Sequence, residues 1–221
     1  MKFGHFDDKN KEYVIDTPYT PLPWINYLAG DDFFSIISNT AGGYSFYRDA
    51  KLRRITRYRY NSPATDNGGR YFYIADENTV FSPAFLPSKT PLDSYKCRHG
   101  LNYTVFESSK NGVSAELTCF VPSSDPCEIN MLTVRNDSEA VKTLSVYGGV
   151  EFCLWNAQDD TTNFQRNYNT GEVEILNEKG FGAVFHKTEY RERRNHFSFF
   201  SVNSCMDGYD TDRDTFLGKF N

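Results

Sequence analysis

The stretch that decides the fold is GVSAELTCFV, which runs from Gly112 to Val121. Successive side chains of a β-strand point to opposite faces of a sheet, so a period of two marks a strand with one buried face. The small and apolar side chains fall on one such face, at Val113, Ala115, Leu117, Cys119 and Val121. We therefore predict a half-buried strand here.

Later segments repeat this alternation. It recurs from Lys142 to Trp155, where Gly148-Gly149 predicts a β-bulge. It also continues on both sides of Asn177–Gly180, which predicts a hairpin with a turn that ends in glycine. A further strand is expected around Phe197–Ser201. No segment of ten or more residues has a clear amphipathic helical pattern.

The composition agrees with a β-rich chain. The 221 residues include 19 Phe, 15 Tyr and 15 Gly, and the short predicted strands are separated by Gly, Asn, Asp and Pro. This pattern predicts one all-β domain, an antiparallel β-sandwich spanning residues 1–221. The final stretch, Asp214 to Asn221, offers no closing strand. We therefore expect the sandwich to be incomplete at its C-terminal end and more chain to follow.

Charge and cysteine content exclude several classes of protein. The net charge is −5 with interspersed signs, which gives no electrostatic case for binding nucleic acid or an anionic membrane. No apolar run is long enough for a membrane helix, and the N-terminus lacks an apolar signal segment. The five scattered cysteines include no CxxC pair, which argues against a zinc site or a disulfide framework. A cytoplasmic location is the expectation.

The candidate metal and acid–base motifs fail on their spacing. When the acidic run Asp207–Asp214 is aligned to a calcium loop from Asp210, Thr215 stands in place of the glycine and Asn221 in place of the final glutamate. We therefore interpret the run as a solvated polar turn. The four histidines have no ligand spacing on a predicted element, and no metal site is predicted. The adjacent pair Asp159-Asp160 does not provide an acid facing a base.

Two other segments have both a functional and a structural interpretation. The basic run Lys51–Tyr60 interleaves cations with aromatics, and we favour arginines that pair with carboxylates and stack on tyrosines over a polyanion site. The stretch Ser38–Ala50 contains Gly42-Gly43, which we interpret as a tight turn rather than a phosphate loop. Within it, Arg48 and Asp49 are candidates for a local ion pair.

The segment with the strongest functional signal is WNAQDDTTNFQRNYN, Trp155 to Asn169. It follows an expected strand and carries amides, carboxylates and an arginine beside two aromatic residues. Amides and carboxylates bind sugar hydroxyls, and aromatic rings pack against the C–H faces of sugars. The segment is therefore either a carbohydrate-binding loop or a long polar loop without a ligand.

Several blocks together resemble one family. They are KFGHFDDKNKEYVIDTPYTPLPWINYL (Lys2–Leu28), SNTAGGYSFYRDA (Ser38–Ala50), CRHGLNYT (Cys97–Thr104), WNAQDDTTNFQRN (Trp155–Asn167) and DTDRDTFLG (Asp210–Gly218). They are similar to the N-terminal part of the cellobiose phosphorylases, which form part of glycoside hydrolase family 94, formerly glycosyltransferase family 36. The resemblance extends from Met1 to Asn221.

The resemblance implies a fold and a reaction. The fold would be an antiparallel super-sandwich of the galactose-mutarotase type, followed by a helical linker and an (α/α)6 catalytic barrel. The reaction would be phosphorolysis of cellobiose, with inversion, to α-glucose 1-phosphate and glucose. The acid and the phosphate-binding residues of the family lie beyond Asn221. No catalytic residue is therefore assigned in this chain, which alone is expected to be inactive, and no cofactor is expected besides inorganic phosphate as co-substrate.

The family also implies a homodimer in which a loop from one sandwich reaches the active-site mouth of the other subunit. We expect this loop to be WNAQDDTTNFQRN, Trp155–Asn167. Its Arg166 and Gln165 would bind the acceptor glucose in trans, and Asn163 and Asn156 would shape the entrance. Two alternatives remain open. One is a phosphorylase for cellodextrins or another β-glucobiose, and the other is a carbohydrate-binding β-sandwich without catalysis.

Overall fold

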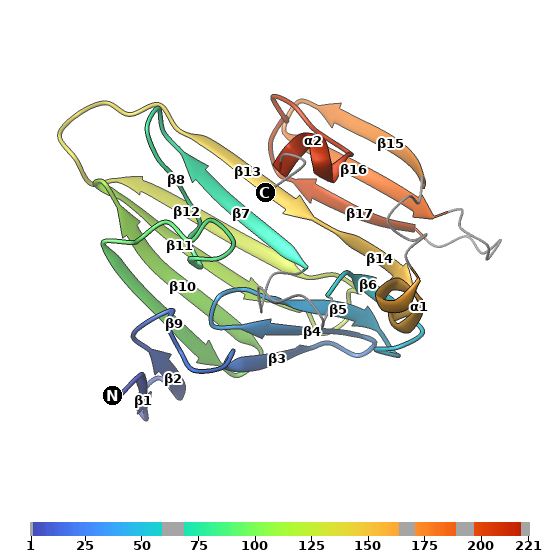
Figure 1. Ribbon diagram of the computed structural model, residues 1–221, viewed down its shortest axis with the longest axis horizontal. Coiled ribbons are helices and arrows are strands. Elements are labelled where there is room, and N and C mark those ends of the chain that lie inside the picture. Colours follow the sequence, from blue (N-terminus) through green and yellow to red (C-terminus); the bar gives the residue numbers. More distant parts are fainter. Residues whose placement is uncertain (1, 59–68, 164–170, 189–196, 218–221) are drawn as a thin grey trace. The chain divides into compact units, whose positions relative to one another are not determined.

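The computed structural model describes residues 2–58, 69–163, 171–188 and 197–217 (Figure 1). The chain divides into two compact units, Met1–Thr162 and Asn163–Asn221. Antiparallel strands dominate the regular structure of the described residues, and only two short helices accompany them. The all-β prediction is therefore confirmed.

The largest sheet of the first unit has six strands. In spatial order they are β1 (Gly4–Asp7), β2 (Glu12–Ile15), β9 (Ser94–Gly100), β10 (Tyr103–Lys110), β11 (Val113–Phe120) and β12 (Ile129–Asn136). The alternating side chains of β11 and Val121 are all at most 4% exposed, which confirms the predicted buried face of this segment.

Two smaller sheets complete the first unit. The five-stranded sheet contains, in order, β14 (Phe152–Trp155), β6 (Arg54–Thr56), β5 (Gly43–Tyr47), β4 (Phe33–Ser38) and β3 (Ile25–Ala29). The three-stranded sheet contains β13 (Ser145–Val150), β7 (Arg70–Ala75) and β8 (Val80–Phe81). Ile74 and Phe81 of this short sheet pack against Val113 and Ala115 of β11, so the short sheet covers part of the long one (Figure 1).

The predicted strand from Lys142 to Trp155 is in fact two strands in different sheets. Gly148 and Gly149 pair regularly with β7, so the bulge predicted at these glycines is wrong. The change of sheet occurs at Glu151, whose carbonyl accepts the Arg57 N–H at 2.7 Å and whose own N–H donates to the Gly69 carbonyl at 3.2 Å. After Glu151, β14 pairs with β6, and the register of this pairing is irregular between Phe152 and Trp155.

The sandwich prediction is confirmed only in part. The strands are antiparallel, but among the described residues they divide among four sheets rather than two facing layers. The segment Ser145–Trp155 contributes to this division because it leaves the β7 sheet and enters the β6 sheet within one residue. A pattern of alternating side chains predicts each strand but not the sheet that it joins.

The turn between β4 and β5 confirms the structural interpretation of Gly42-Gly43. The Ser38 N–H donates to the Gly42 carbonyl at 2.8 Å, which closes the turn. Gly43 has a φ of 134°, and a Cβ at this position would collide with the Ile36 carbonyl. The local Arg48–Asp49 pair is wrong, because Arg48 instead forms a bidentate ion pair with Asp32 at 2.7 and 2.6 Å.

The second unit contains β15 (Gly171–Glu178), β16 (Phe181–Thr188), β17 (Phe197–Val202) and α2 (Arg213–Leu217). The first two strands form the predicted hairpin, and Gly180 in its turn has a φ of 84°. In the acidic run, the Asp212 carboxylate accepts the backbone N–H and the hydroxyl of Thr215 at 3.0 and 2.7 Å. The run is therefore an exposed polar turn that leads into α2, as predicted.

Candidate functional site

The polar segment after β14 begins with a short helix, α1 (Ala157–Thr162). The Asn156 side-chain oxygen accepts the backbone N–H groups of Gln158 and Asp159, both at 3.0 Å, and so caps the first turn. The expectation of a loop throughout this segment is therefore wrong at its start. An N-cap asparagine with aspartates in the first turn is the local sequence signal for such a helix.

A largely buried ion pair anchors α1 to the five-stranded sheet that contains β6. Asp160 is 3% exposed, and Arg57, directly after β6, donates to its carboxylate through Nε at 3.1 Å and Nη2 at 2.8 Å. Burial alone would lower the pKa of Arg57, but the charge and hydrogen bonds of Asp160, together with the charge of Glu151, outweigh burial and raise it. A second tie is the Ala157 N–H, which donates to the Lys51 carbonyl at 2.8 Å. The start of the polar segment is therefore held in one position.

The same contacts settle the interpretation of the basic run. Besides the Arg57–Asp160 pair, the Arg54 guanidinium lies 3.6 Å from the centroid of the Tyr44 ring. Arg57 and Arg54 of the basic run thus pair with a carboxylate and stack on a tyrosine, which is the predicted structural role. Sequence analysis did not identify Arg57 and Asp160 as partners, because they lie 103 residues apart.

The four residues predicted to contact an acceptor sugar are only partly placed. Asn156 caps the N-terminus of α1, and Asn163 follows the C-terminus of the same helix with its side chain partly buried. Gln165 and Arg166 lie outside the described residues. Asn156 and Asn163 thus flank one anchored helix, and the joining of all four residues into one site stays a prediction.

The buried carboxylate of this segment serves a structural contact. Asp160 is committed to Arg57, so the pair Asp159-Asp160 supplies no free acid and base. In the described parts of the chain, no group of three or more His, Cys, Asp or Glu side chains is placed to hold a metal ion. The five cysteines carry free thiols. None of the helices described is long and apolar enough to cross a bilayer.

Comparison with known proteins gives the family. The family model for the supersandwich domain of glycosyl hydrolase 94 matches residues 11–221. The N,N'-diacetylchitobiose phosphorylase of Vibrio proteolyticus is 36% identical over 231 residues, which cover 100% of this chain and 28% of that protein. The solabiose phosphorylase of Paenibacillus borealis is 29% identical over 221 residues, which cover 99% of this chain and 28% of that protein.

A more distant relative has another kind of activity. The cyclic beta-(1,2)-glucan synthase of Rhizobium meliloti is 26% identical over 222 residues, which cover 98% of this chain and 8% of that protein. The chain spans 28% of the length of the two phosphorylases above. The match to the family model extends over nearly all of the chain, and the chain therefore belongs to the glycosyl hydrolase 94 family, as its supersandwich domain.

Proposed function

We propose that this chain is the N-terminal domain of an inverting phosphorylase for β-linked disaccharides, and that its substrate is cellobiose. The observation that carries the proposal is the family match over residues 11–221, joined by whole-chain similarity to two disaccharide phosphorylases. In the reaction, a carboxylic acid protonates the glycosidic oxygen while phosphate attacks the anomeric carbon, so that a sugar 1-phosphate and a free sugar are released. We assign both reacting groups to a barrel outside these 221 residues, so this chain alone does not catalyse.

The role proposed for the domain is to shape the acceptor side of the active-site mouth. The anchored helix α1 supports this role, because the Arg57–Asp160 ion pair fixes the first half of the polar segment Trp155–Asn169. Rigid support of this kind lowers the entropy that a binding loop loses when it meets a sugar. In a homodimer, the segment of one subunit would contact the acceptor sugar of the other through Arg166 and Gln165, with Asn163 and Asn156 at the entrance.

Other β-linked disaccharides are alternatives to cellobiose as the proposed substrate. The names of the relatives give different sugars. Sequence similarity therefore supports the type of reaction more strongly than it supports a particular substrate. A panel of cellobiose, N,N'-diacetylchitobiose, solabiose and cellotriose, each with inorganic phosphate, separates these possibilities. Inorganic phosphate is the only co-substrate proposed, no cofactor is invoked, and the proposed location is the cytoplasm.

The first test measures the acceptor constants in the longer protein. Arg166→Ala is expected to raise the KM for the acceptor sugar in the synthetic direction by about tenfold, with little change in the KM for phosphate in phosphorolysis. Arg213→Ala is the matched control, because Arg213 is a half-exposed arginine of α2 outside the polar segment. Unchanged acceptor constants in Arg166→Ala would remove the acceptor role.

The second test asks whether the contact comes from the partner subunit. One variant carries Arg166→Ala with Gln165→Ala and binds the acceptor weakly, and the other is inactive because it lacks the catalytic acid of the barrel. If the polar segment acts in trans, mixed dimers contain one intact site and recover activity. If it acts within its own subunit, mixing leaves only the residual activity of each parent, and the dimeric part of the proposal fails.

A further inference from the structure

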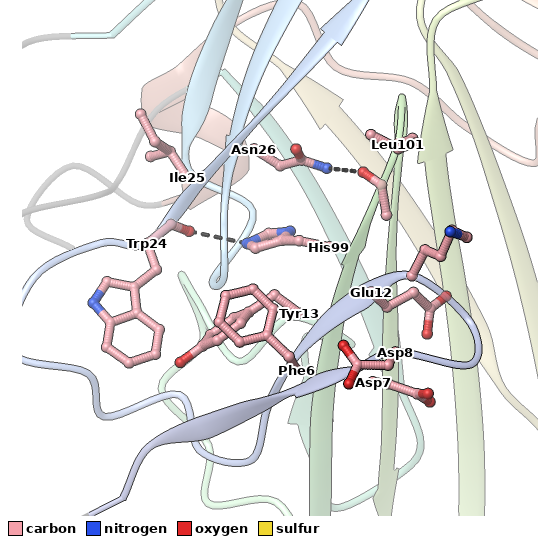
Figure 2. A pocket seen from close by; sticks show the side chains of 12 residues that line it. Phe6, Asp7, Asp8, Glu12, Tyr13, Trp24, Ile25, Asn26, His99 and Leu101 are labelled. Atoms are coloured by element: carbon pink, nitrogen blue, oxygen red, sulfur yellow. Dashed lines mark hydrogen bonds between the residues drawn. The ribbon is translucent and has the colours of Figure 1, made fainter.

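A groove lies on the first unit, and its lining residues are distant in sequence from α1 (Figure 2). It is bounded by the β1–β2 hairpin, by the start of β3 and by the turn between β9 and β10. Its volume is about 810 Å³, within the usual range for small-molecule sites. Among the residues that the structure describes, none of residues 156–163 lines the groove.

One side of the groove is a row of aromatic rings. The centroids of Phe6 and Tyr13 lie 4.8 Å apart, and those of Tyr13 and Trp24 lie 5.7 Å apart, both in edge-to-face geometry. Phe6 is 77% exposed, although exposure of so large an apolar side chain forfeits the free energy of burying it. The rings stand at steep angles to one another, so a ligand in the groove would meet mainly the exposed ring of Phe6, with the half-buried rings of Tyr13 and Trp24 beside it.

The base of the groove is held by polar contacts. The Asn26 amide donates to the carbonyls of Gly100 and Tyr103, both at 2.9 Å. The His99 Nε2 lies 3.0 Å from the Trp24 carbonyl, which only accepts, so Nε2 carries the proton. Burial lowers the pKa of His99, which keeps this imidazole neutral at pH 7. The strand β3 is thereby tied to the β9–β10 turn, and Trp24 stays in place without a ligand.

Glu12 lines the groove and has one carboxylate oxygen without a hydrogen-bond partner among the described residues. The residue is 4% exposed, and its Oε1 accepts Arg98 Nη1 at 2.9 Å and the Tyr103 hydroxyl at 2.7 Å. Its Oε2 is buried and has no hydrogen-bond partner among the described residues. A buried carboxylate oxygen without a donor is costly, so a hydroxyl that reached it from the groove would be favoured. The exposed carboxylate of Asp8 lies at the rim as a second acceptor (Figure 2).

These features together select a class of ligand. Three carboxylates, Asp7, Asp8 and Glu12, line the groove with one cation, Lys11, so the site carries net negative charge and does not suit a polyanion. Partly exposed aromatic rings with carboxylate acceptors beside them suit an extended chain of sugar rings, which offers C–H faces and hydroxyl donors. We propose that the groove binds a β-linked oligosaccharide, separately from the acceptor role assigned to the polar segment. The choice of a sugar rests on the proposed function, whereas the groove itself does not.

The test is a binding titration of the chain with cellotetraose, followed by calorimetry and by the NMR signals of the indole N–H groups. The chain has two tryptophans, Trp24 and Trp155, and the Trp155→Phe variant assigns the signal of Trp24. We expect saturable binding that shifts the Trp24 signal. Phe6→Ala and Asp8→Asn should each weaken binding by about fivefold or more, and both positions are exposed enough to leave the fold intact.

Matched controls separate the possible results. Tyr209→Ala and Asp207→Asn alter an exposed aromatic and an exposed acid outside the groove, and both should bind as the unchanged chain does. Asn156→Ala tests the polar segment, and its failure to bind while Phe6→Ala binds normally would assign the ligand to that segment and overturn the groove. Equal binding of maltotetraose would overturn the β-linkage. No shift of the Trp24 signal at about 10 mM cellotetraose would overturn the proposal and leave the phosphorylase function standing.

Discussion

Arg70 and Glu128 form an ion pair that is almost completely removed from water, with side chains 4% and 8% exposed. The Ser35 and Ser45 hydroxyls donate to Glu128 Oε2 at 2.6 and 2.9 Å, and Arg70 Nη2 donates to the same oxygen at 2.6 Å. Burial alone would raise the pKa of Glu128, but the charge of Arg70 and these hydrogen bonds outweigh burial and lower it. One cluster thus joins β4, β5 and β7 to the residue that precedes β12.

Removing one charge of this pair should be far more harmful than removing a surface charge. Glu128→Gln is expected to lower the free energy of unfolding at pH 7 by about 3–5 kcal/mol, because Arg70 is left buried without its counter-ion. Chemical denaturation measures this loss. Asp32→Asn is the control, since it breaks the exposed pair with Arg48 and should cost much less. Equal losses in the two variants would contradict the account of the cluster.

The same cluster predicts a dependence on pH. A carboxylate whose pKa is lowered in the folded state stabilises the fold above its unfolded pKa, and this stability is lost as the pH falls below it. For Glu128 the loss should begin near the ordinary value of 4.5 and grow toward lower pH. Glu128→Gln should show a shallower fall in unfolding free energy over this range, and a fall as steep as that of the unchanged chain would contradict the lowered pKa.

At the scale of single residues, alternation predicted the apolar core well. Alternate positions of a strand point to the same face of a sheet, and this places four side chains of β11 in the core: Val113, Ala115, Leu117 and Cys119. The buried charges were not predictable in this way. Arg70 and Glu128 lie 58 residues apart, and nothing local to either one indicates that the other will neutralise it. A charged residue without a known partner is expected at the surface.

Helix α1 is too short to be stable by its own hydrogen bonds, since isolated helices of this length do not persist in water. Its stability must come from its cap and from the bond between Asp160 and Arg57. This explains why the sequence predicted a polar loop here. The N-cap signal at Asn156 was present, but the anchoring partner follows β6, far away in the chain.

A double-mutant cycle tests the anchor. Asp160→Asn should lower the free energy of unfolding by about 2 kcal/mol, and with Arg57→Gln it should show a coupling energy of about 1–3 kcal/mol. Glu151 provides an internal control, because its carboxylate is 3.7 Å from the same guanidinium and more exposed than Asp160. The coupling of Glu151→Gln to Arg57→Gln should be smaller. Independent effects of Asp160 and Arg57 would show that the pair does not hold the helix.

At the scale of elements, strand pairing could be predicted from the sequence only where the paired strands are adjacent in the chain. The hairpin of β15 and β16 was predictable, because its two strands are adjacent in sequence and Gly180 marks the turn. The division of the segment Lys142–Trp155 into β13 and β14 was not. It depends on β7 and β6, which lie earlier in the chain and take one half each.

At the scale of the whole molecule, the proposed function treats the described sheets as a scaffold and assigns the reacting groups to a barrel. Two buried charged groups of the first unit, Asp160 and Arg70, are engaged in ion pairs with Arg57 and Glu128. The phosphorylases similar to this chain are more than three times as long, since the match covers 28% of their length. The division of labour between these sheets and a catalytic barrel rests on the resemblance to a family, not on any motif of catalytic residues, and it stays a prediction.

The central claim is that phosphorolysis requires a barrel that these 221 residues do not provide. The direct measurement is release of a sugar 1-phosphate from cellobiose and other β-linked disaccharides with inorganic phosphate, by the purified chain and by the longer protein that includes the barrel. We predict no product above background from the chain and stoichiometric sugar 1-phosphate and free sugar from the longer protein. Turnover by the chain alone, or none by the longer protein on any β-linked disaccharide, would contradict the account.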